Sequence, residues 1–159
     1  MVGLRLALVA ALAGCATTGA LDAEGGPASI SYETGPCFGA CPIYRVTVNA
    51  DGTGVFEGRR WTAVEGSRSF RVTAQQYRRL VAHLEPLRPA SGSVRYSGEA
   101  CEMMATDLPS ADVTWEGPAG TQQLYFYHGC DMEKNRAIAE RLNAVPDLLP
   151  IGEFISAGD

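Results

Sequence analysis

The sequence lacks several features that mark common classes of protein. It has no cluster of Lys or Arg, and 13 basic residues stand against 18 acidic ones, so the formal net charge is −5. A chain with this charge is not expected to bind nucleic acid or to dock electrostatically on anionic lipid. The sequence also contains no nucleotide-binding glycine loop, no G-x-S-x-G element and no H-E-x-x-H element. These absences predict a protein that is not an enzyme and that carries no cofactor.

No apolar run is long enough to span a membrane, which takes about 20 residues, yet the chain begins with a shorter run. Arg5 precedes the apolar residues 6–12, and small residues follow up to Cys15. A charged start and an apolar stretch of about 7 to 15 residues are typical of a secretory signal peptide. The end of the run, Leu12-Ala13-Gly14-Cys15, resembles the lipobox of bacterial lipoproteins. This resemblance implies that residues 1–14 are removed and that Cys15 is lipidated.

The lipobox also predicts the location of the protein. Cys15 is followed by Ala16 and not by the Asp that is associated with inner-membrane retention. In a Gram-negative host this predicts an outer-membrane anchor, with the domain facing the periplasm and a second envelope protein as a candidate partner. Residues 15–28 are mostly small and polar, and this composition predicts a flexible tether behind the lipid-attachment Cys. The alternative is an ordinary signal peptide, or a short buried helix, in which Cys15 has no role.

Of the five cysteines, four lie beyond Cys15, at Cys37, Cys41, Cys101 and Cys130. An even number in an exported protein indicates disulfides, because the compartment is oxidising. The closest pair encloses three residues and is followed by Pro42. A thioredoxin-type redox motif has two residues between its cysteines, and covalent haem attachment needs a histidine directly after the second. Neither spacing is present, so we expect a structural disulfide between Cys37 and Cys41.

Copper binding or thiol-redox chemistry is the alternative function. The sequence Cys37-x-x-x-Cys41-Pro42 resembles the copper motif of Sco-type assembly proteins, which add a distant histidine; here His128 could play that part. Two thiolates and one imidazole suit Cu(I). In Sco-type proteins the motif opens a helix, whereas the residues after Cys41 predict a strand. A four-cysteine zinc site is a further alternative, although its ligand spacing is usually shorter.

The hydrophobic periodicity predicts an α+β fold. Alternation of apolar and polar residues predicts strands at 29–34, in a hairpin over 43–58 with its turn at 49–52, at 67–73, and in a second hairpin over 111–128. A helical stripe begins after a capping box formed by Thr73 and Gln76, and Asp131 is the expected cap of a second helix. Residues 88–110 are rich in Pro, Ser and Gly and predict a long loop. We therefore expect residues 29–156 to form one domain, an antiparallel sheet of about five to six strands with two helices packed on one face.

Three blocks of residues resemble one bacterial family. They are Cys37-Phe38-Gly39-Ala40-Cys41-Pro42-Ile43-Tyr44, Thr106-Asp107-Leu108-Pro109 and Tyr127-His128-Gly129-Cys130. The family is the domain of unknown function numbered 6438, typical of exported proteins and lipoproteins, and the resemblance runs from about residue 30 to residue 155. It implies no activity, because the family has none assigned. It implies that Cys101 pairs with Cys130, while the sequence alone leaves two other connectivities open.

Aromatic residues of the last two strands suggest a binding surface. Tyr125 and Tyr127 alternate with Leu124 and Phe126, so they lie on the opposite face of their strand. Together with Trp115 they predict an exposed aromatic surface for a partner. The sequence as a whole predicts a lipid-anchored envelope protein whose disulfide-bonded domain has a binding or structural role.

Overall fold

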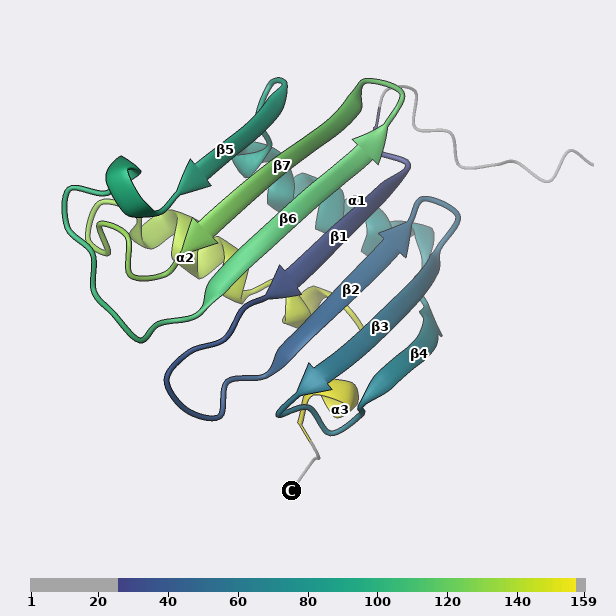
Figure 1. Ribbon diagram of the computed structural model, residues 1–159. Coiled ribbons are helices and arrows are strands. Elements are labelled where there is room, and N and C mark those ends of the chain that lie inside the picture. Colours follow the sequence, from purple (N-terminus) through teal and green to yellow (C-terminus); the bar gives the residue numbers. More distant parts are fainter. Residues whose placement is uncertain (1–25, 157–159) are drawn as a thin grey trace, which may run out of the picture.

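The computed structural model describes residues 26–156 as one mixed sheet with helices on one of its faces (Figure 1). The strands are β1 (Ser29–Thr34), β2 (Ile43–Asn49), β3 (Thr53–Arg60), β4 (Gly66–Arg71), β5 (Gly92–Tyr96), β6 (Ser110–Gly117) and β7 (Gly120–Tyr127). The helices are α1 (Ala74–Leu84), α2 (Arg136–Asn143) and α3 (Gly152–Ile155), with short 3₁₀ segments at Glu85–Leu87, Gly98–Ala100 and Pro146–Leu148. The predicted signal peptide, Cys15 and the predicted tether up to residue 25 lie outside the described residues. Within residues 26–156, no helix has the length and apolar character needed to cross a membrane.

The α+β prediction holds, but the sheet differs from the expected one. Its seven strands follow the order β4-β3-β2-β1-β6-β7-β5, and every neighbouring pair is antiparallel except β5 and β7, which are parallel. The extra strand, β5, lies inside the predicted loop over residues 88–110. Its partner β7 is distant in sequence, and half-buried Val94 and Tyr96 pack against the core. Non-local pairing therefore overrides the loop-like composition of this segment.

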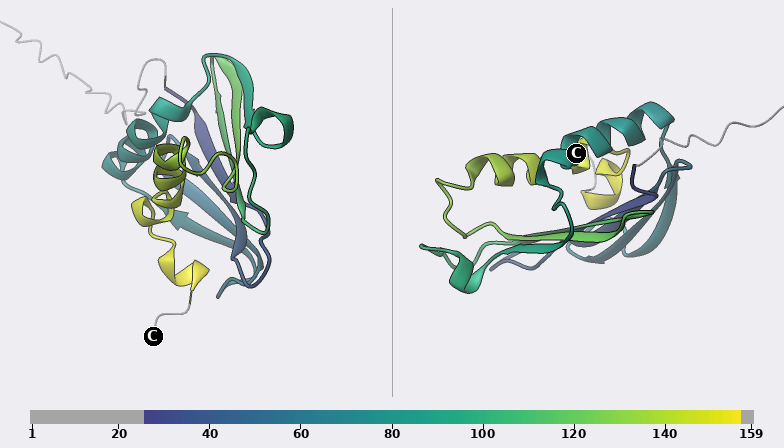
Figure 2. Two further views of the ribbon diagram at one scale, coloured as in Figure 1. Left: turned by 90° about the vertical axis from the view of Figure 1, so that its left-hand side faces the viewer. Right: turned by 90° about the horizontal axis from the view of Figure 1, so that it is seen from above.

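The helix α1 connects the two edges of the sheet. It follows the edge strand β4 and leads to β5 at the opposite edge, so its path crosses one face (Figures 1 and 2). The predicted capping box is present: the Thr73 hydroxyl accepts from the Gln76 backbone N–H at 3.2 Å, and the Gln76 side chain accepts from the Thr73 backbone N–H at 2.8 Å. All three helices lie on the same face, and α3 adds a third helix to the two that were predicted.

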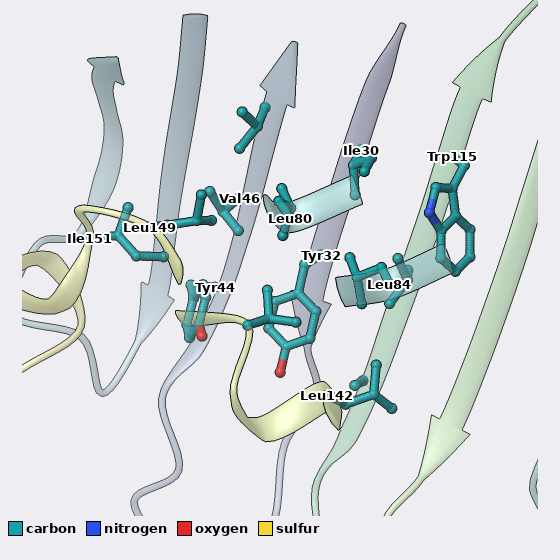
Figure 3. Close-up of a cluster of buried hydrophobic side chains, with 14 of the residues drawn as sticks. Ile30, Tyr32, Tyr44, Val46, Leu80, Leu84, Trp115, Leu142, Leu149 and Ile151 are labelled. Atoms are coloured by element: carbon teal, nitrogen blue, oxygen red, sulfur yellow. The ribbon is translucent and has the colours of Figure 1, made fainter. Parts of the chain in front are cut away.

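The core lies between this face and the helices (Figure 3). Alternate residues of β1, β2, β6 and β7 point toward it, as their periodicity predicts, and α1 contributes its own apolar stripe. The largest fully buried side chains are Trp115, Phe56, Phe126, Ile30, Leu80, Leu84, Leu124, Leu142 and Ile151. Fully burying one such side chain contributes about 1.5–3 kcal/mol.

The second helix begins later than predicted. The N-cap of α2 is Asn135, and Asp131 lies four residues before it. The Asp131 carboxylate instead accepts hydrogen bonds from the backbone N–H groups of Met103, at 2.7 Å, and Glu102, at 3.1 Å. The prediction that Asp131 caps this helix is therefore wrong, because backbone donors that are distant in sequence use its oxygens. Its role is to hold the segment after β5 against the end of β7.

Candidate functional site

Both disulfides lie at one end of the sheet. Cys37 is joined to Cys41 in the connection between β1 and β2, and Cys101 after β5 is joined to Cys130 after β7. This is the pairing that the family resemblance implied. The strand register places the end of β1, the start of β2, the start of β6 and the end of β7 at this same end. We call it the disulfide end of the sheet, and residue 29 lies at the opposite end.

The short disulfide ring is attached to its surroundings by backbone hydrogen bonds. Gly39 has φ +126°, a conformation that side chains disfavour, which explains glycine in the ring. The backbone N–H of Phe38 donates to the Asp107 carbonyl at 3.1 Å. The Thr34 hydroxyl donates to the Pro42 carbonyl at 2.8 Å. These contacts fix the path from β1 to β2 beside the segment that precedes β6.

The second disulfide lies in a more deeply buried network. Asp131 is only 7% exposed, and the Asn135 side chain donates to the Cys130 carbonyl at 2.9 Å. The backbone N–H of Met103, helped by that of Glu102, lowers the pKa of the Asp131 carboxyl. The carboxylate is therefore ionised at neutral pH and accepts both bonds. This network orders the irregular segment between β5 and β6.

A pocket of about 410 Å³ opens at the disulfide end, a volume within the range of small-molecule sites. Strand ends form its floor, the Cys37–Cys41 connection forms one wall, and the segment from α2 to α3 forms another. Its lining residues are Tyr32, Thr34, Cys41, Pro42, Tyr44, Pro109, Ser110, His128, Asn143, Pro146, Asp147, Gly152, Ile155 and Ser156. The pocket thus joins four parts of the chain that are distant in sequence.

Two tyrosines give the pocket its polar floor. Tyr32 and Tyr44 are 4% and 3% exposed, on the neighbouring strands β1 and β2, and their ring centroids lie 6.2 Å apart. Figure 3 shows both hydroxyl groups directed toward the disulfide end of the sheet. No hydrogen bond within residues 26–156 involves either hydroxyl, and in this part of the chain neither oxygen is among the fully buried side-chain atoms without a partner, which are Arg45 Nε and Trp115 Nε1. Two hydroxyl groups are thus available for hydrogen bonds to a ligand.

The protonation states of these side chains follow from their burial. Burial raises the pKa of Tyr32, and burial, with smaller contributions from an ionised Tyr32 and from the negative charge of Asp147, raises the pKa of Tyr44. Burial lowers the pKa of His128, which packs its edge against Phe126 with the ring centroids 5.1 Å apart. At neutral pH both phenols are protonated and the imidazole is uncharged.

The residues of the copper alternative are only partly brought together. Cys41 and His128 line the same pocket, whereas Cys37 does not. Cys37 and Cys41 are bonded to each other, so neither offers a thiolate unless the disulfide is reduced. Among the residues with a described position, no group of three His, Cys, Asp or Glu side chains is placed to hold a metal ion.

The prediction that Trp115 belongs to an exposed aromatic surface is wrong. This side chain is 0% exposed, because its position in β6 faces the helices together with Val113. Tyr125 and Tyr127 do lie on the other face of the sheet, where both are half-buried. The Arg95 guanidinium lies 3.8 Å from the centroid of the Tyr125 ring, and the Tyr127 hydroxyl accepts from the Leu108 backbone N–H at 3.3 Å. These tyrosines already contact their own domain.

The sequence patterns did not identify Tyr32, Tyr44 and Asp147 as residues that line the pocket. The strand alternation assigns both tyrosines correctly to the core face, but it does not show that their hydroxyls reach a cavity. One signal was available: each tyrosine is the core-facing residue nearest to the cysteine loop. No sequence pattern around Asp147 indicates a site residue, because Asp147 reaches the pocket only through the packing of the segment after α2.

These features define a class: a two-layer α+β domain with a pocket between its sheet and its C-terminal helical segment. The family model described as "Domain of unknown function (DUF6438)" matches residues 28–148, and the chain belongs to this family. Neither the comparison with curated proteins nor the comparison with solved structures gives a match. The matched region contains both disulfides and both pocket tyrosines.

The two disulfides should differ in their contribution to stability. Replacing Cys101 and Cys130 together by Ser should lower the free energy of unfolding by about 3.5 kcal/mol, because their bond closes a loop of roughly 30 residues. Replacing Cys37 and Cys41 should cost about 2 kcal/mol, because that ring is short. Urea unfolding of both double variants measures the difference. A short-ring variant that is the less stable of the two would contradict the chain-entropy explanation.

His128 should titrate below the ordinary histidine range. The imidazole Cε1–H resonance, followed by NMR, should give a midpoint below about 6.5, because burial disfavours the charged ring. Because the pKa of His128 is then lower in the folded state than in the unfolded state, the unfolded state takes up the proton first as the pH falls. The titration of His128 therefore has little effect on the free energy of unfolding at pH 7 and lowers it as the pH falls below about 6.5. The variant His83→Gln assigns the resonances. A His128 midpoint at or above 6.5 would show that the ring is solvated.

Proposed function

We propose that this protein is a lipid-anchored bacterial envelope protein whose disulfide-bonded α+β domain binds a small ligand and does not catalyse a reaction. The observation that carries the binding role is the pocket floor, where the buried Tyr32 and Tyr44 place unpartnered hydroxyl groups. A ligand that enters the pocket can bond to both hydroxyls, so the arrangement suits binding.

Two observations support the envelope location. Residues 1–15 have the pattern of a lipoprotein signal ending at Cys15. Two disulfides join the four other cysteines, and disulfides persist in oxidising compartments such as the periplasm. Because Ala16 follows the lipidated cysteine, the proposed location of the anchor in a Gram-negative host is the outer membrane, with the domain facing the periplasm.

The position of the pocket suits a domain that is tethered through its N-terminus. Residue 29 begins β1 at the end of the sheet opposite to the disulfide end. The Tyr77 hydroxyl donates to the Pro27 carbonyl at 2.6 Å and holds the entering chain beside α1. A lipid anchor that enters here leaves the pocket directed away from the point of attachment.

The side-chain chemistry of the pocket favours binding over catalysis. Tyr32 and Tyr44 have raised pKa values and keep their protons at neutral pH, so neither serves as a general base. His128 is uncharged and half-buried against Phe126, so its free ring nitrogen can accept a hydrogen bond from a ligand. The pocket therefore offers donors and acceptors that orient a ligand.

Replacement of the lipidation site tests the anchor. The variant Cys15→Ser should release the domain from the membrane fraction or block its processing, because a covalent lipid is the anchor that the sequence offers. Fractionation followed by immunoblotting measures this, with Ala16→Ser as the matched control that should stay in the membrane fraction. A Cys15→Ser protein that is processed normally and remains on membranes in high salt would refute the lipobox assignment.

Copper or thiol chemistry remains the second candidate function, because Cys41 and His128 line one pocket. If Cys37–Cys41 is structural, it should resist mild reductant, since such disulfides usually have potentials below about −300 mV. Thiol titration after incubation with glutathione should find no free thiol among the four cysteines beyond Cys15, and Cu(I) binding should stay at background. Uptake of one equivalent of Cu(I) after mild reduction, lost in Cys37→Ser and weakened in His128→Ala, would instead establish the copper function.

A further inference from the structure

The charge that lines the pocket has one sign. No Lys or Arg is among the lining side chains that the structure describes, and His128 is uncharged at neutral pH. Asp147 is the lining residue that carries a full charge, and no ion pair joins it to another described residue. Asp147 is an exposed residue. The pocket therefore presents a negative potential to an entering ligand.

Asp147 and Tyr44 face the same space. Both line the pocket, and Asp147 is close enough for its charge to contribute to the raised pKa of Tyr44. The carboxylate comes from the 3₁₀ segment Pro146–Leu148, whereas the phenol comes from β2. A ligand group between them would meet a carboxylate on one side and a hydroxyl oxygen on the other. An ammonium group, with three donors and no acceptor, matches these two acceptors.

We propose that the pocket binds a small primary amine, with its ammonium group between the Asp147 carboxylate and the Tyr44 hydroxyl oxygen. This inference rests on the proposed function, since it names the ligand class for the same pocket. Tyr32, whose ring centroid lies 6.2 Å from that of Tyr44, also lines the pocket and supplies a further hydroxyl group. The apolar part of the ligand lies against Pro42, Pro109 and Ile155, which line the remaining walls.

Other ligand classes fit this lining less well. An anion would approach the unpaired carboxylate of Asp147 with no lining cation to offset the repulsion. A neutral alcohol could bond to the tyrosine hydroxyls, to Ser110 and to Asn143, but it would gain nothing from the charge. The order of affinity expected from electrostatics is therefore amine, then alcohol, then carboxylate.

Three probes of similar size but different charge test the inference: benzylamine, benzyl alcohol and benzoate. Each is titrated into the mature protein, purified after export, and NMR chemical-shift changes report both affinity and location. Benzylamine should bind saturably at pH 7, with resonances of Tyr32, Tyr44 and residues 146–148 shifting, and it should bind more tightly than benzyl alcohol by up to about fivefold. Benzoate should bind most weakly.

Matched variants separate the contributions of charge and hydroxyl. Asp147→Asn should remove the preference for amine over alcohol, a loss of up to about fivefold in benzylamine affinity, because it removes the charge and keeps the shape. Glu153→Gln removes the same charge from a nearby exposed residue that does not line the pocket, and it should change nothing. Tyr44→Phe should weaken both benzylamine and benzyl alcohol. An unchanged amide spectrum without ligand shows that each variant is folded.

The outcomes distinguish this inference from the proposed function. If benzylamine and benzyl alcohol bind equally and both are weakened by Tyr44→Phe, the pocket binds ligands but the amine assignment is overturned. Tightest binding of benzoate, or an undiminished amine preference in Asp147→Asn, also overturns it. If no probe binds saturably at tens of millimolar, both the amine assignment and the binding role of this pocket fail.

Discussion

The structure depends on the burial of a single face of the seven-stranded sheet. Alternate residues of the central strands are apolar toward the helices, whereas the opposite face carries charged pairs such as Glu33 with Arg45 and with Arg59. Every helix must therefore lie on the same side (Figure 2). To cover that side, α1 crosses the sheet after β4, and the next strand enters at the far edge, parallel to β7. The mixed topology follows from this one requirement.

The helices cover most of this face, and a pocket remains at the disulfide end. Reciprocal bonds join α1 to α2: the His83 ring donates to the Arg141 carbonyl at 2.7 Å, and the Arg141 guanidinium donates to the His83 carbonyl at 2.7 Å. The last helix covers β3 instead, with the rings of Phe154 and Phe56 5.5 Å apart. Between these contacts the hydroxyl ends of two core tyrosines reach open space. The disulfides hold the irregular loops around that space, where regular backbone pairing is scarce.

Much of the fold follows from local chemistry that a sequence displays directly. Alternation within β2 and β3 and the Gly52 turn between them specify a hairpin, because strand faces and turn geometry depend on neighbouring residues. The capping box at Thr73 specifies where α1 begins for the same reason. The family model matches residues 28–148, and the three residues between Cys37 and Cys41 argue against a thioredoxin-type site, which has two. These local features can be predicted from a short stretch of sequence, without knowledge of the rest of the chain.

The sequence by itself determined the hairpins, the first helix, the α+β class, the family and the number of cysteines available for pairing. Only the tertiary structure decided which loop segment becomes β5, that Trp115 is buried, and that Asp131 bonds to a distant loop instead of capping a helix. The pocket also depends on the tertiary structure, because Tyr32, Tyr44 and Asp147 meet only after the sheet has formed and the helices cover it. The physical reason is range: local geometry depends on neighbours along the chain, whereas burial and pocket formation depend on residues that meet in space.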